Sequence, residues 1–321
     1  MAIEASIEGV NSVIRPVICI DATHLKARTR GVMLVAVCKD RNEMIYPLAF
    51  GFANSESTKS WTWFLKKLRK VIKNPDRVML VSDRHNGIFN AMEAIFPNAT
   101  HGVCAYHLAQ NLKRFCKQRN DLIWLYYSAT YAYRIEDFDR AMGELKETCP
   151  KVYNELLGVG VEKFSRVHSP KKRYFLITTN IAESMNSCLL GARKLPITAM
   201  AECIRDLLQR WFYDRQTNAL EMSTYLTAFA DEQIKQRTEI ADRSAIHPIH
   251  YMKFKVDDKW IPRTVDLDEH SCSCRQWDLD ELSCSHAMAV ARYGSRSFKY
   301  VHLSVMVFLQ ALNCVCWCVM A

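Results

Sequence analysis

The chain has 321 residues, a formal net charge of +9, 49% hydrophobic residues and 24% charged residues. These values are those of a globular protein, not of a disordered or fibrous one, and allow about two domains. The positive charge favours an acidic partner such as nucleic acid, although a solvated basic surface gives the same charge. The thirteen cysteines argue against a secreted disulfide framework, since many stand in apolar runs where buried free thiols are expected.

Strand-like and helix-like segments alternate over the first hundred residues, and the short links between the first three strands favour antiparallel hairpins. The apolar runs that predict strands are 17–25, 31–40, 44–53, 77–83 and 100–108. The segments with helical spacing of apolar residues are 59–72, 87–96 and 109–117. The predicted order is therefore β-β-β-α-β-α-β-α.

The remainder of the chain is predicted to be mostly helical. Residues 120–170 are rich in aromatic residues at helical spacing, which predicts an all-α insertion outside the sheet. Further helices are predicted after Thr178-Thr179-Asn180 and over about 197–222. After His247-Pro248 the pattern changes to short strands and a Cys/His cluster, so we expect a small second domain from about residue 250.

Two predicted strands end on a carboxylate. Asp21 follows the apolar run Val17–Ile20, and Asp83 follows the fourth strand. Each aspartate alone is explained as a turn former or a helix N-cap. However, the predicted order lets the two strands lie side by side, and two carboxylates at neighbouring strand ends repel unless a cation lies between them. Magnesium or manganese suits such oxygen ligands, and strand alternation places Thr23 on the same face as Asp21.

A third acid is needed for a two-metal site, and Glu183 in TTNIAESMNS is the best candidate. Its position also fits a capping box, with Asn180 as the N-cap and Glu183 at the third helical position. On position alone the capping box is favoured. Glu93 and Glu202 are alternative third acids.

Several segments resemble the transposase domain of Mutator-like elements, the plant MULE group, in order and spacing from about residue 10 to 300. They are DATHLKARTRG, IYPLAFGFANSESTKSWTWFL, VSDRHNGIFNAMEAIFPNATHGVCAYHLAQNLK and TTNIAESMNS. The resemblance implies an α/β fold, an RNase H-like mixed sheet of the predicted β-β-β-α-β-α-β order with an all-α insertion. The implied core covers residues 10–225, with the insertion at about 120–170.

The same resemblance implies DDE-type chemistry. Asp21, Asp83 and Glu183 match the first, second and third catalytic acids, which hold two Mg²⁺ or Mn²⁺ ions. The implied function is metal-dependent DNA strand cleavage and strand transfer. The implied partners are DNA, as transposon ends and target, and further copies of the chain in a homo-oligomer, and the implied location is the nucleus.

Basic residues near the predicted strand ends are candidates for DNA contacts, because ammonium and guanidinium groups bind phosphates. They are Lys26, Arg28, Arg30 and Arg84. The alternative for most of them is a solvated turn residue.

Four metal-ligand residues stand close together near the C-terminus. Cys272 and Cys274 form one pair, and Cys284 and His286 form a second pair nine residues later. Thiolate and imidazole ligands in two tight pairs suit tetrahedral zinc, and four protein ligands indicate a structural ion. The pattern resembles the SWIM zinc finger, which implies a zinc-binding module over about 250–300.

A second Cys/His pair, Cys104 and His107, ends the fifth predicted strand. Spacing alone favours a buried thiol beside a helix-capping histidine. The resembled family carries a C-x-x-H at this point, which makes the pair a candidate for metal binding, for a structural role or for a target-strand contact. No further ligands for it are identified.

Both ends of the chain depart from the resembled family. The N-terminus shows no signal-peptide pattern and begins almost at the first catalytic strand, without the expected DNA-recognition region. The tail 301–321 contains no Lys, Arg, Asp or Glu, yet His302, Gln310 and Asn313 dilute it, so we expect no membrane partner. Both features suggest a truncated element copy or an altered reading frame at the end of the chain.

Two alternatives to a transposase remain open at this point. The first is a non-catalytic, domesticated DNA- or protein-binding transcriptional regulator, which the missing N-terminal region favours and the presence of all three acids disfavours. The second is a zinc protein that acts only through protein contacts. It would require a core that binds neither magnesium nor DNA.

Overall fold

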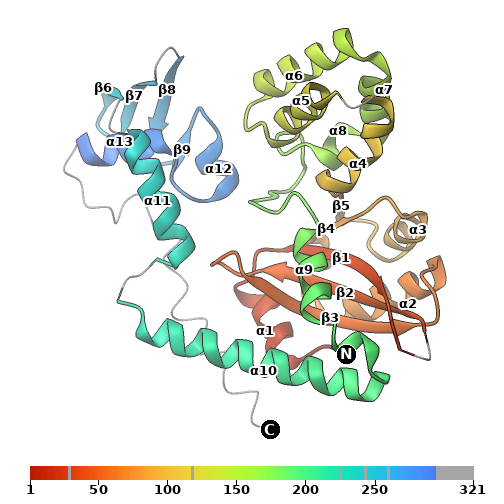
Figure 1. Ribbon diagram of the computed structural model, residues 1–321. Helices are drawn as coiled ribbons and strands as arrows, with labels where there is room; N and C mark the ends of the chain where they lie inside the picture. Colours follow the sequence, from red (N-terminus) through yellow and green to blue (C-terminus); the bar gives the residue numbers. More distant parts are fainter. Residues whose placement is uncertain (28–29, 117–118, 224–225, 242–243, 259–260, 294–321) are drawn as a thin grey trace.

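The computed structural model describes most of residues 1–293 (Figure 1). The ranges that are not described are 28–29, 117–118, 224–225, 242–243, 259–260 and 294–321. Two features of the sequence, Arg28 and the apolar tail, therefore lie outside the described residues.

The centre of the molecule is a mixed sheet with the strand order β3-β2-β1-β4-β5. Its strands are β1 (Val17–His24), β2 (Val32–Lys39), β3 (Ile45–Ala53), β4 (Met79–Ser82) and β5 (Thr100–Val103). The first three strands pair antiparallel, whereas β4 pairs in parallel with β1, and β5 pairs in parallel with β4. This order is that of the RNase H-like fold, as predicted.

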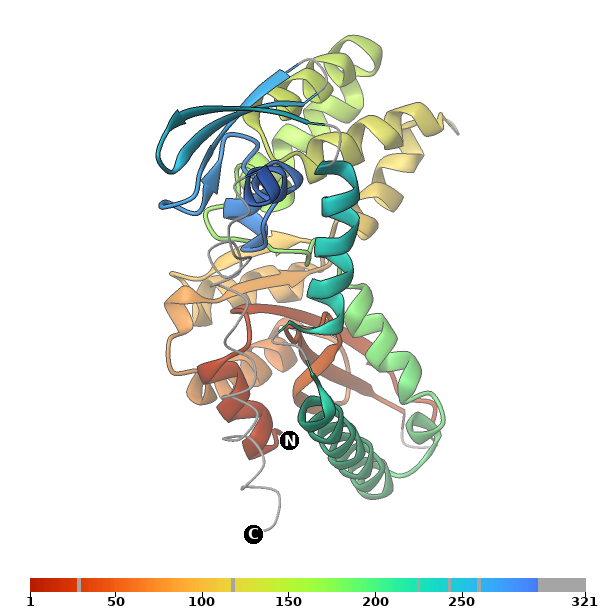
Figure 2. The ribbon, with the colours of Figure 1, turned by 90° about the vertical axis from the view of Figure 1, so that its left-hand side faces the viewer.

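Helices cover both faces of this sheet, on opposite sides in Figure 2. One face carries α2 (Thr58–Val71) and α3 (Asn86–Ile95), and the other carries α9 (Asn180–Cys188) and α10 (Ile197–Glu221). Strand β1 contributes apolar side chains to both faces. Ile18 packs in the core between the sheet and helices α2 and α3, and Cys19 packs in the core between the sheet and helices α9 and α10. Alternate strand residues point to opposite faces.

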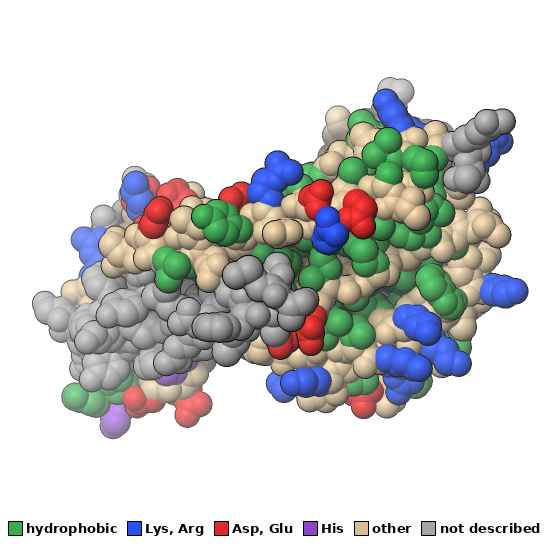
Figure 3. Space-filling view, turned by 90° about the horizontal axis from the view of Figure 1, so that it is seen from below, with side chains coloured by type: hydrophobic (Ala, Val, Ile, Leu, Met, Phe, Trp, Pro, Cys, Tyr) green, Lys and Arg blue, Asp and Glu red, His purple; other side chains and the backbone are tan. Residues whose placement is uncertain are grey.

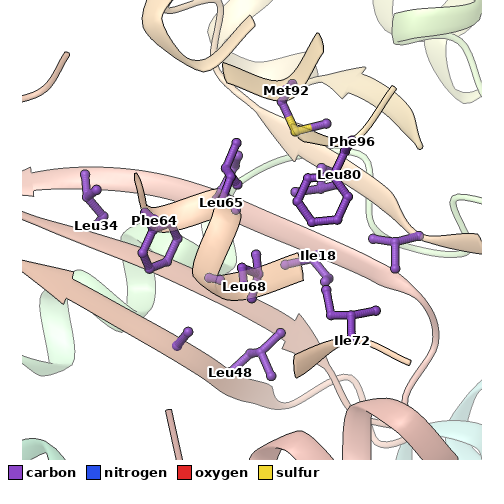
Figure 4. Close-up of a cluster of buried hydrophobic side chains, with 14 of the residues drawn as sticks. Ile18, Leu34, Leu48, Phe64, Leu65, Leu68, Ile72, Leu80, Met92 and Phe96 are labelled. Carbon is purple, nitrogen blue, oxygen red and sulfur yellow. The ribbon is translucent and has the colours of Figure 1, made fainter. Parts of the chain in front are cut away.

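The α2 side of the sheet shows how a local pattern builds this core. Phe64, Leu65 and Leu68 lie on one face of α2 and pack against Ile18 and Leu48 of the sheet (Figure 4). Ser57 caps the helix, because its side chain accepts a hydrogen bond from Ser60 N. Burying each large apolar side chain contributes about 1.5–3 kcal/mol, so packing of this face holds α2 in place.

The fifth strand is shorter than the sequence pattern predicts. It ends at Val103, and α4 (Ala105–Cys116) begins two residues later. The buried residues Ala105, Leu108, Ala109 and Leu112 have helical spacing, so the apolar run 100–108 contains both a strand end and a helix start. The helices α1 (Glu4–Ser12) and α11 (Ala228–Ala241) and the short helix at Gln276–Asp280 were not predicted by the pattern.

The all-α insertion forms a separate bundle with its own apolar core above the sheet in Figure 1. Its helices are α5 (Asn120–Tyr131), α6 (Ile135–Thr148), α7 (Pro150–Val159) and α8 (Val161–Phe164). Short 3₁₀ turns stand at Pro75–Arg77 and Ala192–Lys194.

The C-terminal part is a second sheet with two helices, against which α11 packs. Its elements are β6 (Ala245–His250), β7 (Lys253–Asp258), β8 (Ile261–Asp266), β9 (Ser271–Cys272), α12 (Gln276–Asp280) and α13 (Ser285–Tyr293). Within the described ranges, every helix is too short or too polar to cross a lipid bilayer.

Candidate active site and zinc centre

The two aspartates of the sequence pattern meet at one edge of the central sheet. Strands β1 and β4 pair in parallel, with Val17 opposite Met79 and Cys19 opposite Val81. Continuing this register by two residues sets Asp21 opposite Asp83. Because parallel strands end at the same edge, the carboxyl ends of β1 and β4 present both side chains there.

Asp21 is half-buried, and its Oδ2 accepts a hydrogen bond of 2.9 Å from Asn186 Nδ2. Burial raises the pKa of Asp21 to about 7, and the charges of Asp83 and Glu183 act in the same direction. A carboxyl with this pKa releases its proton readily to solvent when a cation binds beside it, because the positive charge favours the ionised form.

Asp83 directly follows β4, where its Oδ1 accepts a hydrogen bond of 3.1 Å from His85 N. The N-cap of α3 is His85, whose Nδ1 accepts from Gly87 N at 3.2 Å. Asp83 therefore stabilises the turn after the strand without capping the helix.

Glu183 stands in the first turn of α9, but the predicted capping box is wrong. The helix begins at Asn180, and its N-cap is Thr179, whose side chain forms no capping hydrogen bond. The backbone N of Thr179 instead donates to Cys104 Sγ at 3.2 Å, which fixes the start of the helix one residue earlier than predicted.

The side chain of Glu183, which takes no part in a capping box, points toward His107, with Oε1 3.4 Å from Nε2. That oxygen is buried and makes no hydrogen bond. The alternative acids lie elsewhere, since Glu93 is exposed on α3 and Glu202 pairs with Arg205 at 2.8 Å on α10.

Cys104 and His107 form a local network with the start of α9. His107 Nδ1 lies 3.4 Å from Thr179 Oγ1. The hydrogen bond with Cys104 is the largest effect on His107 and raises its pKa to about 9. Burial raises the pKa of the Cys104 thiol, but hydrogen bonds with His107 and Thr179 outweigh it and lower that pKa overall. The pair thus connects α4 to the helix that carries Glu183.

The acidic edge has the chemistry of a divalent-cation site. Asp21 has a raised pKa and Glu183 has a buried oxygen without a hydrogen bond, and both would gain from a cation between the carboxylates. The carboxylate oxygens of these acids are less closely clustered than the ligand atoms of the Cys/His cluster near the C-terminus. Over the described ranges, only Cys272, Cys274, Cys284 and His286 bring three or more ligand atoms within 4.8 Å of one another.

These four residues form the candidate zinc centre. Cys272 ends β9, Cys274 lies in the following turn, and Cys284 and His286 stand at the start of α13. Hydrogen bonds from Cys272 and Cys284 lower the pKa of Cys274 far below its ordinary value. Three thiols and an imidazole at mutual distances within 4.8 Å are consistent with structural, tetrahedral zinc.

The basic residues of the sequence pattern have different surroundings. Lys26 and Arg30 are exposed beside the acidic edge, whereas Arg84 Nη1 pairs with Glu155 Oε1 at 2.8 Å. Arg84 would have to leave this acid to bind phosphate.

The sequence pattern missed Asn186, which orients Asp21. The sequence could have indicated that Asn186 lies near the site, because it follows Glu183 by three residues and therefore shares its helix face. The partner in β1, 165 residues away, was not visible in the sequence.

Comparisons with known proteins agree with this arrangement. Residues 17–111 match the MULE transposase domain, and residues 263–294 match the SWIM zinc finger. No curated protein matches the chain.

Among solved structures, the chain is similar to a chain of the "CryoEM structure of simian T-cell lymphotropic virus intasome in complex with PP2A regulatory subunit B56 gamma", with 13% identity and a TM-score of 0.21. That similarity covers 50% of this chain and 54% of that chain. The first match includes Asp21 and Asp83 but ends before Glu183, and the second includes the Cys/His cluster. The protein therefore carries a MULE transposase domain followed by a SWIM zinc finger.

Proposed function

We propose that this protein is a DDE-type transposase that cleaves DNA strands and transfers them to a target. The observation that supports this most directly is the electrostatic coupling at the sheet edge, where the charges of Asp83 and Glu183 both raise the pKa of Asp21. The three acids come from β1, from the residue after β4 and from the first turn of α9, and the register of β1 and β4, continued by two residues, sets Asp21 opposite Asp83.

In this proposal Asp21, Asp83 and Glu183 hold two Mg²⁺ or Mn²⁺ ions, and Asn186 fixes the rotamer of Asp21. Bound there, the ions would supply charge neutralisation and activation of the attacking oxygen for displacement at phosphorus. His107, whose pKa is raised to about 9, lies 3.4 Å from Glu183 and adds positive charge beside the third acid. DNA is the substrate, and the nucleus is the proposed location.

The test is nicking of supercoiled plasmid by the purified chain with magnesium or manganese. Asp83→Asn removes one carboxylate charge with little change in shape and is expected to abolish nicking. Glu93→Gln and Glu202→Gln are the matched controls, because they remove an exposed acid outside the site. Equal nicking by Asp83→Asn and the two controls would contradict the proposed catalytic role.

A second candidate is a non-catalytic DNA-binding regulator, which one observation favours. His107 already lies 3.4 Å from Glu183, so an imidazolium compensates the acid that a metal would otherwise meet. This candidate predicts salt-dependent DNA binding without metal-dependent nicking. The plasmid assay combined with a binding titration separates the two functions.

A further inference from the structure

The solvent face of α2 is a stripe of lysines, on the opposite side of the helix from its packing face. Lys59, Lys66, Lys67 and Lys70 are exposed, and we call them the lysine stripe. Lys59 and Lys66 are seven residues apart, and Lys70 follows the adjacent Lys66 and Lys67 by four and three residues, so all four lysines lie on one side of the helix. Residues 58–71 contain no aspartate or glutamate, so α2 offers these lysines no acidic neighbour of its own.

The lysine stripe lacks the acid partners that other exposed basic residues have. Among the described residues, no ion pair within 4.0 Å involves the four lysines, whereas Arg140 pairs with Asp137 at 3.1 Å. Lys66 and Lys70 are four residues apart and Lys67 and Lys70 are three apart, so their like charges destabilise the helix. An anionic partner would remove this repulsion.

An exposed aromatic ring stands within the stripe. Trp63 is 46% exposed and lies one turn from both Lys59 and Lys67. It borders an open groove of about 350 Å³ that Lys67 and Lys70 also line. Seen from below, Lys and Arg side chains gather on the part of the surface where α2 lies (Figure 3).

The stripe begins beside the acidic edge of the sheet. The C-terminal ends of β1 and β3 lie at that edge, because His24 pairs with Val32 and Val32 with Ala53. Helix α2 starts there and runs back across the sheet. Glu56, just before α2, has its Oε1 3.7 Å from Nδ1 of His85, in the turn that follows Asp83.

We propose that the lysine stripe binds the phosphate backbone of duplex DNA as it leaves the active site, independently of base sequence. The inference rests on the proposed function, in which DNA is the substrate. From Lys59 to Lys70 the helix advances about 17 Å, which is the axial length of about five base pairs. Ammonium groups spread over that length contact successive phosphates and release their counterions.

The experiment measures binding of a 30-base-pair duplex of arbitrary sequence by fluorescence anisotropy, without divalent metal, between 50 and 200 mM salt. The stripe variant is Lys59→Gln, Lys66→Gln, Lys67→Gln and Lys70→Gln combined. The control combines Arg140→Gln, Arg205→Gln, Lys253→Gln and Lys255→Gln, which removes the same four charges from exposed residues that pair with acids. Thermal unfolding of both variants checks the fold, and the stripe variant should be no less stable because it loses like-charge repulsion.

The stripe variant is expected to bind at least about tenfold more weakly, with a slope of log K against log salt smaller by about 3 to 4. The control should change the slope by less than about 1. Equal losses in both variants would mean that net charge alone acts, and would overturn the proposal. So would a stripe variant that binds DNA normally but loses binding to vesicles containing phosphatidylserine.

The binding experiment can fail independently of the cleavage test. DNA binding through the lysine stripe without plasmid nicking would contradict the proposed catalytic function but support the proposed binding surface. Plasmid nicking by a stripe variant whose salt slope is unchanged would support the catalytic function but contradict the binding surface.

Discussion

Asn186 of α9 donates a hydrogen bond of 2.9 Å to Asp21 of β1, joining the helix of the third acid to the strand of the first. Asn186 is 6% exposed, and its Oδ1 makes no hydrogen bond. The amide nitrogen of Asn186 therefore fixes the orientation of one oxygen of the Asp21 carboxylate.

Replacing this amide should impair the site more than the fold. Asn186→Ala removes the bond to Asp21, and we expect plasmid nicking to fall by about tenfold to a hundredfold, the effect typical of losing a residue that orients a metal ligand. The free energy of unfolding should fall by only about 1–2 kcal/mol. Ser187→Ala is the control, since Ser187 is exposed and bonds only to the backbone O of Glu183. Wild-type nicking by Asn186→Ala would refute the orienting role.

Zinc should hold the C-terminal module together. Cys284→Ser removes a buried ligand, and the ion stabilises such modules by on the order of 10 kcal/mol. We expect loss of bound zinc, measured by mass spectrometry, and exposure of Trp277, which is 2% exposed in the folded module, measured by its fluorescence. Cys188→Ser changes an exposed thiol and should retain zinc. Retention of zinc by both variants would exclude Cys284 as a ligand.

A buried ion pair should fasten the zinc module to the helices beside it. Asp280 Oδ2 accepts hydrogen bonds of 2.9 Å from Arg237 of α11 and from Tyr133 of the insertion, and Asp280 is fully buried. Asp280→Ala leaves the buried Arg237 guanidinium without its counter-charge, which costs about 3–5 kcal/mol. Asp137→Ala breaks an exposed pair and should cost less than about 1 kcal/mol. Urea denaturation compares the two variants, and similar costs would argue against the fastening role.

His101 should make the stability depend on pH. Burial lowers the pKa of His101 to about 4, below the value of about 6.5 in an unfolded chain. Between these values the unfolded state binds a proton that the folded state does not, so the free energy of unfolding rises with pH across that window. The contribution, on the order of 2–3 kcal/mol, is complete above about pH 6.5 and is lost as the pH falls toward 4.

The measurement for His101 is thermal or urea unfolding at several pH values. His101→Gln should flatten the dependence between about pH 4 and 6.5, because glutamine keeps a polar group near Ser82 Oγ, now 2.8 Å from His101 Nε2, without titrating. His250→Gln, at an exposed histidine, should leave the dependence unchanged. An unaltered profile in His101→Gln would contradict the assignment.

The sequence by itself determined the features that depend on short-range patterns. Alternation and helical spacing defined the strands of the central sheet, because each element buries one face. The candidate zinc ligands were predictable because all four lie within residues 272–286, so their spacing is visible in a short stretch of the sequence. The position of Asp21 and Asp83 at strand ends also followed from the apolar runs before them.

Only the tertiary structure decided which side chains meet. The bonds from Asn186 to Asp21 and from Arg237 to Asp280 join segments 165 and 43 residues apart, and periodicity identifies a buried face but not its partner. Helix α11 escaped prediction because its buried positions include Ala230, Arg237 and Ala241, which give a weak apolar pattern. The capping box failed because Thr179 bonds to Cys104, a contact that exists only once α4 and α9 have packed together.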